Sequence, residues 1–157
     1  MKQKIYNKME EWYPYIAGFF DGEGCIVIYK NKRTKGINFY HNLFVTATQQ
    51  DIKPLKKIKQ IFGGQVRLIN RKNTKSNYFT WQASGKIALT FLKKISPYLI
   101  IKKEQALLGI KFQEEKSLEK PIYIKGNKHS SLNKFQIKKR EKYKLKISIL
   151  NHKFSKK

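Results

Sequence analysis

The sequence predicts an α+β fold in which an antiparallel sheet carries helices on one face. Two pairs of runs rich in β-branched and aromatic residues are each joined by a short polar turn, which is typical of β-hairpins. Helix-periodic segments precede, separate and follow these pairs, so the predicted element order is αββαββα. Hairpins that alternate with helices build one antiparallel sheet with the helices packed against it.

The first helix is predicted to begin near residues 10–11, with Pro14 in its first turn, and to end within residues 22–24. Strands at residues 25–33 and 37–49 then form the first hairpin. In the second of these strands, apolar and polar side chains alternate, as expected for a sheet with one buried face.

Asp51 has the side chain of a helix N-cap, and a helix is expected over residues 52–62. The glycine pair at residues 63–64 ends it. Strands at residues 65–72 and 78–84 form the second predicted hairpin, again with alternating side chains.

Two further helices are expected after the second hairpin. Ser84 is predicted to cap a helix over residues 86–95, which Pro97 ends, and residues 98–115 form the next one. Residues 1–116 would then make up the core of a single domain.

Residues 117–157 are predicted to be a basic helical extension of the same domain. A capped helix is expected after Ser131 or Asn133. Its basic side chains include Lys138, Lys139 and Arg140. Such runs are often solvated faces, but contact with phosphate is at least as plausible here.

The charge of the chain indicates a polyanionic partner. The 157 residues include 35 Lys and Arg against 10 Asp and Glu, for a formal net charge of +25. Nucleic acid is the default partner of such a domain. No apolar run approaches the roughly 18 residues that a membrane span requires. The lone Cys25 excludes an intramolecular disulfide and a zinc-finger framework, and we expect it in the core.

The segment YIAGFFDGEGC, residues 15–25, is the most informative stretch. Gly18 and Gly22 lie four residues apart and would share one side of a helix, where a second copy of that helix could approach closely. Glu23 would then lie beside its symmetry mate. Paired carboxylates in so basic a chain suit a hard divalent cation such as Mg²⁺. The alternative is a helix C-terminus with two glycines and two solvated acids.

This segment resembles the LAGLIDADG motif of the homing endonucleases, in a single copy. The resemblance implies a homodimer whose motif helices pair at the centre and whose sheets form a saddle over double-stranded DNA. The implied dimer contacts are Tyr15, Ala17, Gly18, Asp21 and Gly22. A symmetric dimer should bind a pseudo-palindrome on the order of 20 bp.

The resemblance also implies catalytic residues. Glu23, with the main-chain carbonyl of Gly22, would bind Mg²⁺ or Mn²⁺. Gln49 would orient water, and Lys53 and Lys102 would stabilise charge on the phosphate. The implied reaction is metal-dependent hydrolysis of a phosphodiester bond in each DNA strand.

One face of the predicted sheet would contact the DNA. A two-stranded ribbon fits the major groove, and long hydrogen-bonding side chains can pair with base edges. A solvated face is the alternative for any one of these residues. The predicted contacts are Tyr29, Asn31, Arg33, Tyr40, Asn42, Thr46, Arg67, Arg71, Thr80 and Gln82.

Two other functions remain open from the sequence. Some proteins with this motif assist intron splicing, so the chain could be an RNA-binding maturase, or it could be a DNA-binding regulator that does not cleave. A pure binding module has no need for paired acids that repel phosphate, so Glu23 favours the nuclease. The abundance of Lys, Ile and Asn indicates an A/T-rich gene, hence a chloroplast or mitochondrion, with a bacterial cytoplasm as the alternative.

Overall fold

The computed structural model describes residues 9–32, 39–69, 77–119 and 132–153. Arg33 and Arg71, both predicted to contact DNA, lie outside these residues. The described elements confirm the predicted order, together with the further helix expected after it and the helix expected in the extension. They are α2 (Tyr13–Glu23), β1 (Gly24–Lys32), β2 (Phe39–Gln49), α3 (Ile52–Phe62), β3 (Gln65–Ile69), β4 (Tyr78–Ser84), α4 (Gly85–Ile95), the 3-10 helix η1 (Ser96–Tyr98), α5 (Lys103–Leu118) and α6 (Lys134–His152).

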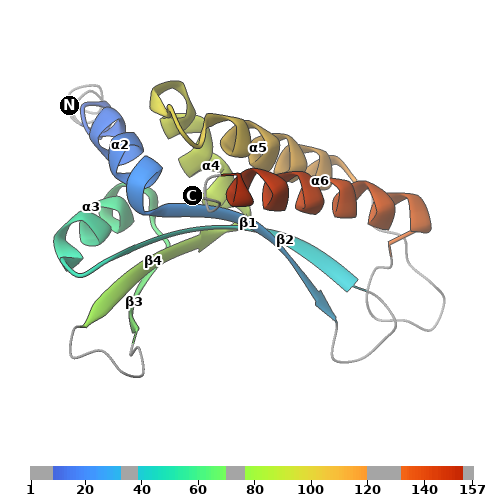
Figure 1. Ribbon diagram of the computed structural model, residues 1–157, viewed down its shortest axis with the longest axis horizontal. Coiled ribbons are helices and arrows are strands. Elements are labelled where there is room, and N and C mark those ends of the chain that lie inside the picture. Colours follow the sequence, from blue (N-terminus) through green and yellow to red (C-terminus); the bar gives the residue numbers. More distant parts are fainter. Residues whose placement is uncertain (1–8, 33–38, 70–76, 120–131, 154–157) are drawn as a thin grey trace.

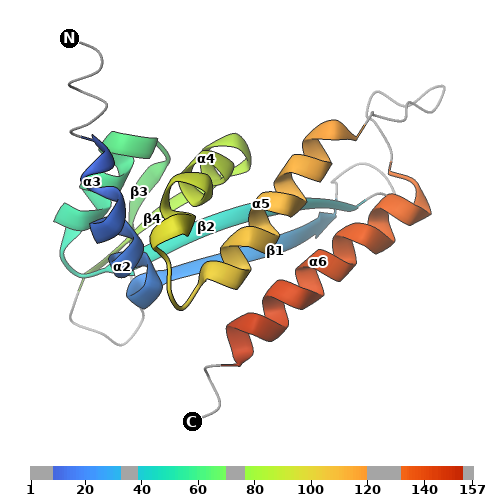
Figure 2. The same cartoon turned by 90° about the horizontal axis from the view of Figure 1, so that it is seen from above.

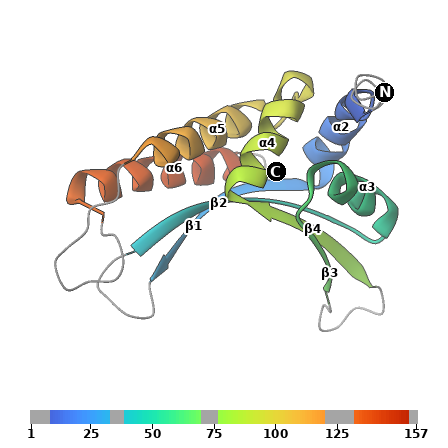
Figure 3. The same cartoon turned by 180° about the vertical axis from the view of Figure 1, so that it is seen from behind.

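The four strands form one antiparallel sheet in the order β1-β2-β4-β3. The sheet arches, and the helices lie on its convex side (Figures 1 and 3). The fold is therefore the predicted α+β layer, with one face of the sheet covered and the other left open.

The strand register divides the side chains between the two faces. Alternate residues of each strand point to the helices and form the core with them, among them Ile26, Ile28, Leu43, Val45, Ala47, Trp81 and Ala83. The predicted polar side chains fall together on the concave face. Their cross-strand pairs there are Tyr29–Asn42, Asn31–Tyr40, Thr46–Gln82 and Arg67–Thr80.

Three aromatic rings join α2, α4 and β4 in the centre of the core. The ring centroid of Phe91 lies 5.0 Å from that of Phe20 and 4.7 Å from that of Trp81. All three side chains are fully buried. The indole N–H of Trp81 donates to the carbonyl of Gly63 at 2.8 Å, which satisfies the one polar atom of the cluster. These contacts fix α2 against the sheet.

Gly64→Ala should destabilise the protein by about 2 kcal/mol or more, because strain and a clash add at this position. Gly64 has φ +88°, and a Cβ there would lie 2.7 Å from Trp81 Nε1. Gly85→Ala is the matched control, since Gly85 has φ +56° but no atom within 4 Å of a Cβ. The midpoint of urea unfolding measures both variants. Equal losses would mean that the contact with Trp81 adds nothing to the backbone strain.

The helix predicted over residues 98–115 begins later, at Lys103. The preceding chain is turned away from helical geometry, because its N–H groups bond to a side chain from α2. The Asp21 carboxylate accepts from the N–H groups of Ile100 at 2.7 Å, Ile101 at 3.2 Å and Lys102 at 2.9 Å. Ser84 precedes α4 as predicted, but its side chain makes no capping hydrogen bond.

The N-cap of helix α6 is Asn133, one of the two predicted caps. The Asn133 and Gln136 side chains form a capping box, each bonding to the other's N–H. The helix lies beside β1, at the edge of the sheet (Figure 2). Ile147 and Leu150 are buried, and Asn151 Nδ2 donates to the Ile26 carbonyl at 2.9 Å. No described helix is long and apolar enough to cross a membrane.

Candidate active site and nucleic-acid interface

Helix α2 has one buried side and one open side. Ile16 and Phe20 pack in the core, whereas Gly18 and Gly22 are exposed and a Cβ on either would meet no atom within 4 Å. The described part of the chain therefore gives no packing reason for these two glycines. Tyr15, 52% exposed, belongs to the same open side.

Two of the residues predicted to contact a second copy face inward instead. Ala17 is fully buried in the core of its own chain, so it offers no surface to a partner. Asp21 is 8% exposed and holds the segment before α5 through the hydrogen bonds described above. Asp21 is thus a structural residue within its own chain.

The end of α2 brings an acid and a base together. Glu23, the last residue of the helix, is exposed and makes no hydrogen bond or ion pair with the described residues. The Lys102 ammonium donates to the main-chain carbonyl of Asp21, which places it at the same helix end. Partial burial lowers the pKa of Lys102, while the charges of Asp21 and Glu23 oppose this by favouring the protonated form.

The other two predicted catalytic residues lie at the end of β2 and at the start of α3. Gln49 is two residues beyond Ala47, which pairs with Gly24. Its Oε1 accepts from the N–H of Gln50 at 2.7 Å. Lys53 is exposed in the first turn of α3, where its N–H donates to the capping carboxylate of Asp51 at 2.9 Å. No hydrogen bond or ion pair between described residues joins either side chain to Glu23.

The donor set of one chain fits a divalent metal only in part. Glu23 offers a hard carboxylate oxygen at the open end of α2, which is the type of ligand that Mg²⁺ and Mn²⁺ take. Within the described residues, no three His, Cys, Asp or Glu side chains are grouped to hold an ion. Further oxygens would have to come from a second copy, from a phosphate or from water.

The concave face of the sheet carries the predicted DNA contacts and several residues that the prediction missed. Phe44, Thr48 and Gln65 share this face by register, and the Arg67 guanidinium donates to Gln65 Oε1. Strict alternation from Thr46 and Arg67 would have found all three. Cys25 is also exposed here, so its predicted place in the core is wrong.

The basic extension is only partly available to a partner. Lys138 is exposed, whereas Lys139 pairs with Glu115 at 3.1 Å. Arg140 is 7% exposed and pairs with Glu119, so its predicted role in phosphate binding is wrong. The guanidinium instead helps to hold α6 against the end of α5.

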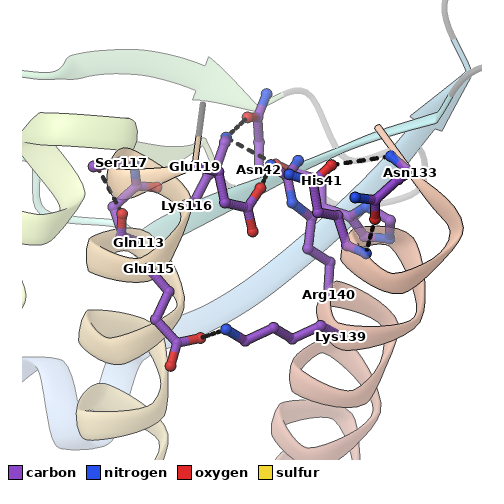
Figure 4. A network of polar contacts seen from close by, with 11 residues as sticks. His41, Asn42, Gln113, Glu115, Lys116, Ser117, Glu119, Asn133, Lys139 and Arg140 are labelled. Carbon is purple, nitrogen blue, oxygen red and sulfur yellow. Dashed lines mark hydrogen bonds and ion pairs between the residues drawn. The ribbon is translucent and has the colours of Figure 1, made fainter. Parts of the chain in front are cut away.

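A polar network joins α5, α6 and β2 at this place (Figure 4). His41 is fully buried, and its Nε2 lies 3.2 Å from Glu141 Oε1. Burial lowers the pKa of His41, and the bond to Glu141 opposes that shift. Lys116 donates from α5 to the His41 carbonyl at 2.8 Å and to Asn42 Oδ1 at 2.6 Å. Burial lowers the pKa of Lys116 as well.

The arched sheet has a polar open face, and beside it α2 ends in the exposed Glu23, where the Lys102 ammonium from the segment before α5 also lies. These features define a class of α+β protein suited to nucleic acid. Residues 16–114 match the LAGLIDADG endonuclease family. Since this match spans more than half of the 157 residues, the chain belongs to the LAGLIDADG endonuclease family.

Solved structures share the fold at low sequence identity. The homing endonuclease I-CvuI, in complex with the I-CreI target, has a TM-score of 0.69 and 22% identity, over 91% of this chain and 83% of that one. The archaeal intron-encoded homing endonuclease I-Vdi141I, complexed with DNA, has a TM-score of 0.66 and 18% identity, over 88% and 82% of the two chains.

One curated relative matches through a small part of its length. Reverse gyrase of Methanocaldococcus jannaschii is 30% identical over 105 residues, which are 67% of this chain and 6% of that protein. The chain therefore spans only a small fraction of this relative.

Proposed function

We propose that the protein is a site-specific homing endonuclease that cuts both strands of DNA, depends on a divalent metal and acts as a homodimer. The observation that carries the proposal is the exposed Glu23 at the end of α2, next to the Lys102 ammonium. Lys102 interacts with Glu23 electrostatically, but its ammonium bonds to the Asp21 carbonyl, and Glu23 forms no ion pair with a described residue. A free carboxylate there is available to a metal ion.

The residues at this helix end can divide the chemistry of hydrolysis among them. A bound divalent cation supplies activation of water and stabilisation of the leaving oxygen. Glu23, together with the Gly22 carbonyl, would hold that cation. Lys102 would stabilise negative charge on the phosphate as water attacks phosphorus and the bond to the 3′ oxygen breaks. We assign the water-orienting role to Gln49 and a second stabilising charge to Lys53.

The open side of α2 supports the proposed homodimer. Each chain carries one Glu23, whereas a double-strand cut needs two phosphodiester bonds to be hydrolysed. A second α2 packed against Gly18 and Gly22, which leave the surface bare of side chains, would bring the two carboxylates together. Tyr15 would flank this contact. The two copies would then read a pseudo-palindrome on the order of 20 bp.

The concave face would seat the DNA. Its polar side chains come from all four strands and include Tyr29, 50% exposed, and the exposed Arg67. A sheet that curves around the duplex can place such side chains along the major groove. Of the three predicted phosphate contacts in the basic extension, Lys138 is exposed and forms no ion pair with a described residue, so it would be available to phosphate.

Cleavage of a randomised palindromic DNA library with Mg²⁺, with Ca²⁺ and with EDTA tests the proposal. We expect double-strand cuts at one recoverable sequence with Mg²⁺ and none with EDTA, because the hydrolysis needs the bound cation. Selective binding without cutting under every condition would instead make the protein a non-cleaving DNA-binding regulator. Absence of selective DNA binding, with tight binding of intron RNA, would make it a maturase.

A further inference from the structure

We propose that Lys116, a residue of the helical layer, sets the base preference of Asn42 on the DNA-facing side of the sheet. Lys116 would act as a positioning residue: it holds the Asn42 amide so that only the Nδ2 donor faces the groove. This inference rests on the proposed function, since it concerns how the concave face reads a DNA sequence.

The contact is possible because part of β2 has a free edge. The pairing of β2 with β4 ends at Phe44 and Ser84, so the described residues before Phe44 have a strand neighbour only on the β1 side. Lys116 extends from α5 to this edge and donates to the His41 carbonyl at 2.8 Å and to Asn42 Oδ1 at 2.6 Å (Figure 4). A side chain from the convex side thereby reaches a residue of the concave face.

The chemistry of the two groups determines which way the amide points. An ammonium has three N–H donors and no acceptor, so the Asn42 atom that it contacts must be the oxygen. The second bond, to the His41 carbonyl, holds the ammonium at the strand edge. Because Lys116 is partly buried and its hydrogen bonds offset the cost of burying its charge, we expect the arrangement to persist when DNA binds.

A restrained amide reads bases differently from a free one. A free Asn pairs with adenine through both ends, accepting from N6 and donating to N7. With its oxygen held by Lys116, Asn42 offers donors alone. Guanine, which presents N7 and O6 as two acceptors in the major groove, then fits better than adenine, and cytosine, which presents an N4 donor, fits worst.

The test is selection of bound sites from a library with randomised half-sites, in Ca²⁺ so that binding is scored without cutting. Asn42→Ala first identifies the contacted position, as the one where the base preference disappears. Lys116→Met should then shift the preference at that position from guanine towards adenine by on the order of tenfold, the size of one good amide–adenine pairing. Preferences elsewhere in the site should stay as they are.

Two control variants separate positioning from charge and stability. Lys111→Met removes the same charge from an exposed position of α5 and should leave the base preference unchanged. Lys116→Arg keeps a donor at the strand edge and should retain the guanine preference. A purely structural role of Lys116 would lower the unfolding midpoint in Lys116→Met without moving the preference at the Asn42 position.

Asn42→Asp provides a second route if Lys116→Met folds poorly. It replaces the Nδ2 donor with an acceptor, so the preference at the same position should move to cytosine. An unchanged preference in Lys116→Met, or in Asn42→Asp, would overturn the inference while the endonuclease proposal stands. Loss of all sequence selectivity in the wild-type protein would overturn both.

Discussion

Glu23→Gln should lower DNA cleavage by about 10³-fold or more, comparable with the removal of a main electrostatic contribution to a transition state. The change takes away the exposed carboxylate at the end of α2 and leaves an amide of the same size. DNA binding should remain intact or become tighter, because the substitution also removes a negative charge near phosphate. Single-turnover cleavage with Mg²⁺ and a binding titration in Ca²⁺ measure the two effects separately.

Glu114→Gln is the control for this substitution. Glu114 is a half-exposed acid on α5 that pairs with Lys93 at 2.5 Å, and losing such a pair costs about 1 kcal/mol or less. Cleavage by Glu114→Gln should therefore match the wild type. If Glu23→Gln loses binding and thermal stability together with cleavage, Glu23 is a structural residue and the proposed metal ligand must be sought elsewhere.

Asp21→Ala should lower the free energy of unfolding by roughly 2–4 kcal/mol, because one carboxylate accepts three main-chain N–H bonds. The segment before α5 would lose its side-chain attachment to α2, so the Lys102 ammonium, left only with its bond to the main-chain carbonyl of residue 21, would be held less firmly at the end of α2. Cleavage should fall for that second reason, even at temperatures where the variant is folded. Urea unfolding measures the stability.

Asp21→Asn gives the graded comparison. It keeps one acceptor oxygen and removes the charge, so we expect about half of the loss seen in Asp21→Ala. Hydrogen exchange of the Ile100 and Lys102 amides reports the anchoring directly and should speed up in both variants. Unchanged exchange, with full stability, would mean that the Asp21 carboxylate does not anchor this segment.

The fold could be predicted from local patterns because its main signals are local. Pro14 in the first turn of α2 and the cap at Asn133 depend on neighbouring residues, and both are confirmed. The predicted start of α5 was wrong because the residue that determines it, Asp21, lies about eighty residues earlier in the sequence. The predicted phosphate contact of Arg140 was wrong for a similar reason, since nothing near Arg140 in the sequence indicates its pairing with Glu119.

The candidate site was predictable to the extent that a motif or an alternation marks it. The motif identifies Glu23, and the structure places Lys102 at the same helix end. Alternation predicts the concave face, and the strand register shows that Cys25 also belongs to it. No sequence motif or alternation distinguishes Lys116 from the other lysines of its helix. Its proposed role became visible only in the structure, where its side chain contacts Asn42 at the free edge of β2.

The position of α6 has a consequence for how the protein behaves in solution. Strand β1 is an outer strand of the sheet, and α6 lies along it, with Asn151 bonded to the Ile26 carbonyl. An uncovered outer strand can pair with the same strand of another molecule and seed aggregates. Helix α6 thus shields this edge of the sheet from pairing with another molecule, and its lysines add a charge repulsion that opposes non-specific association.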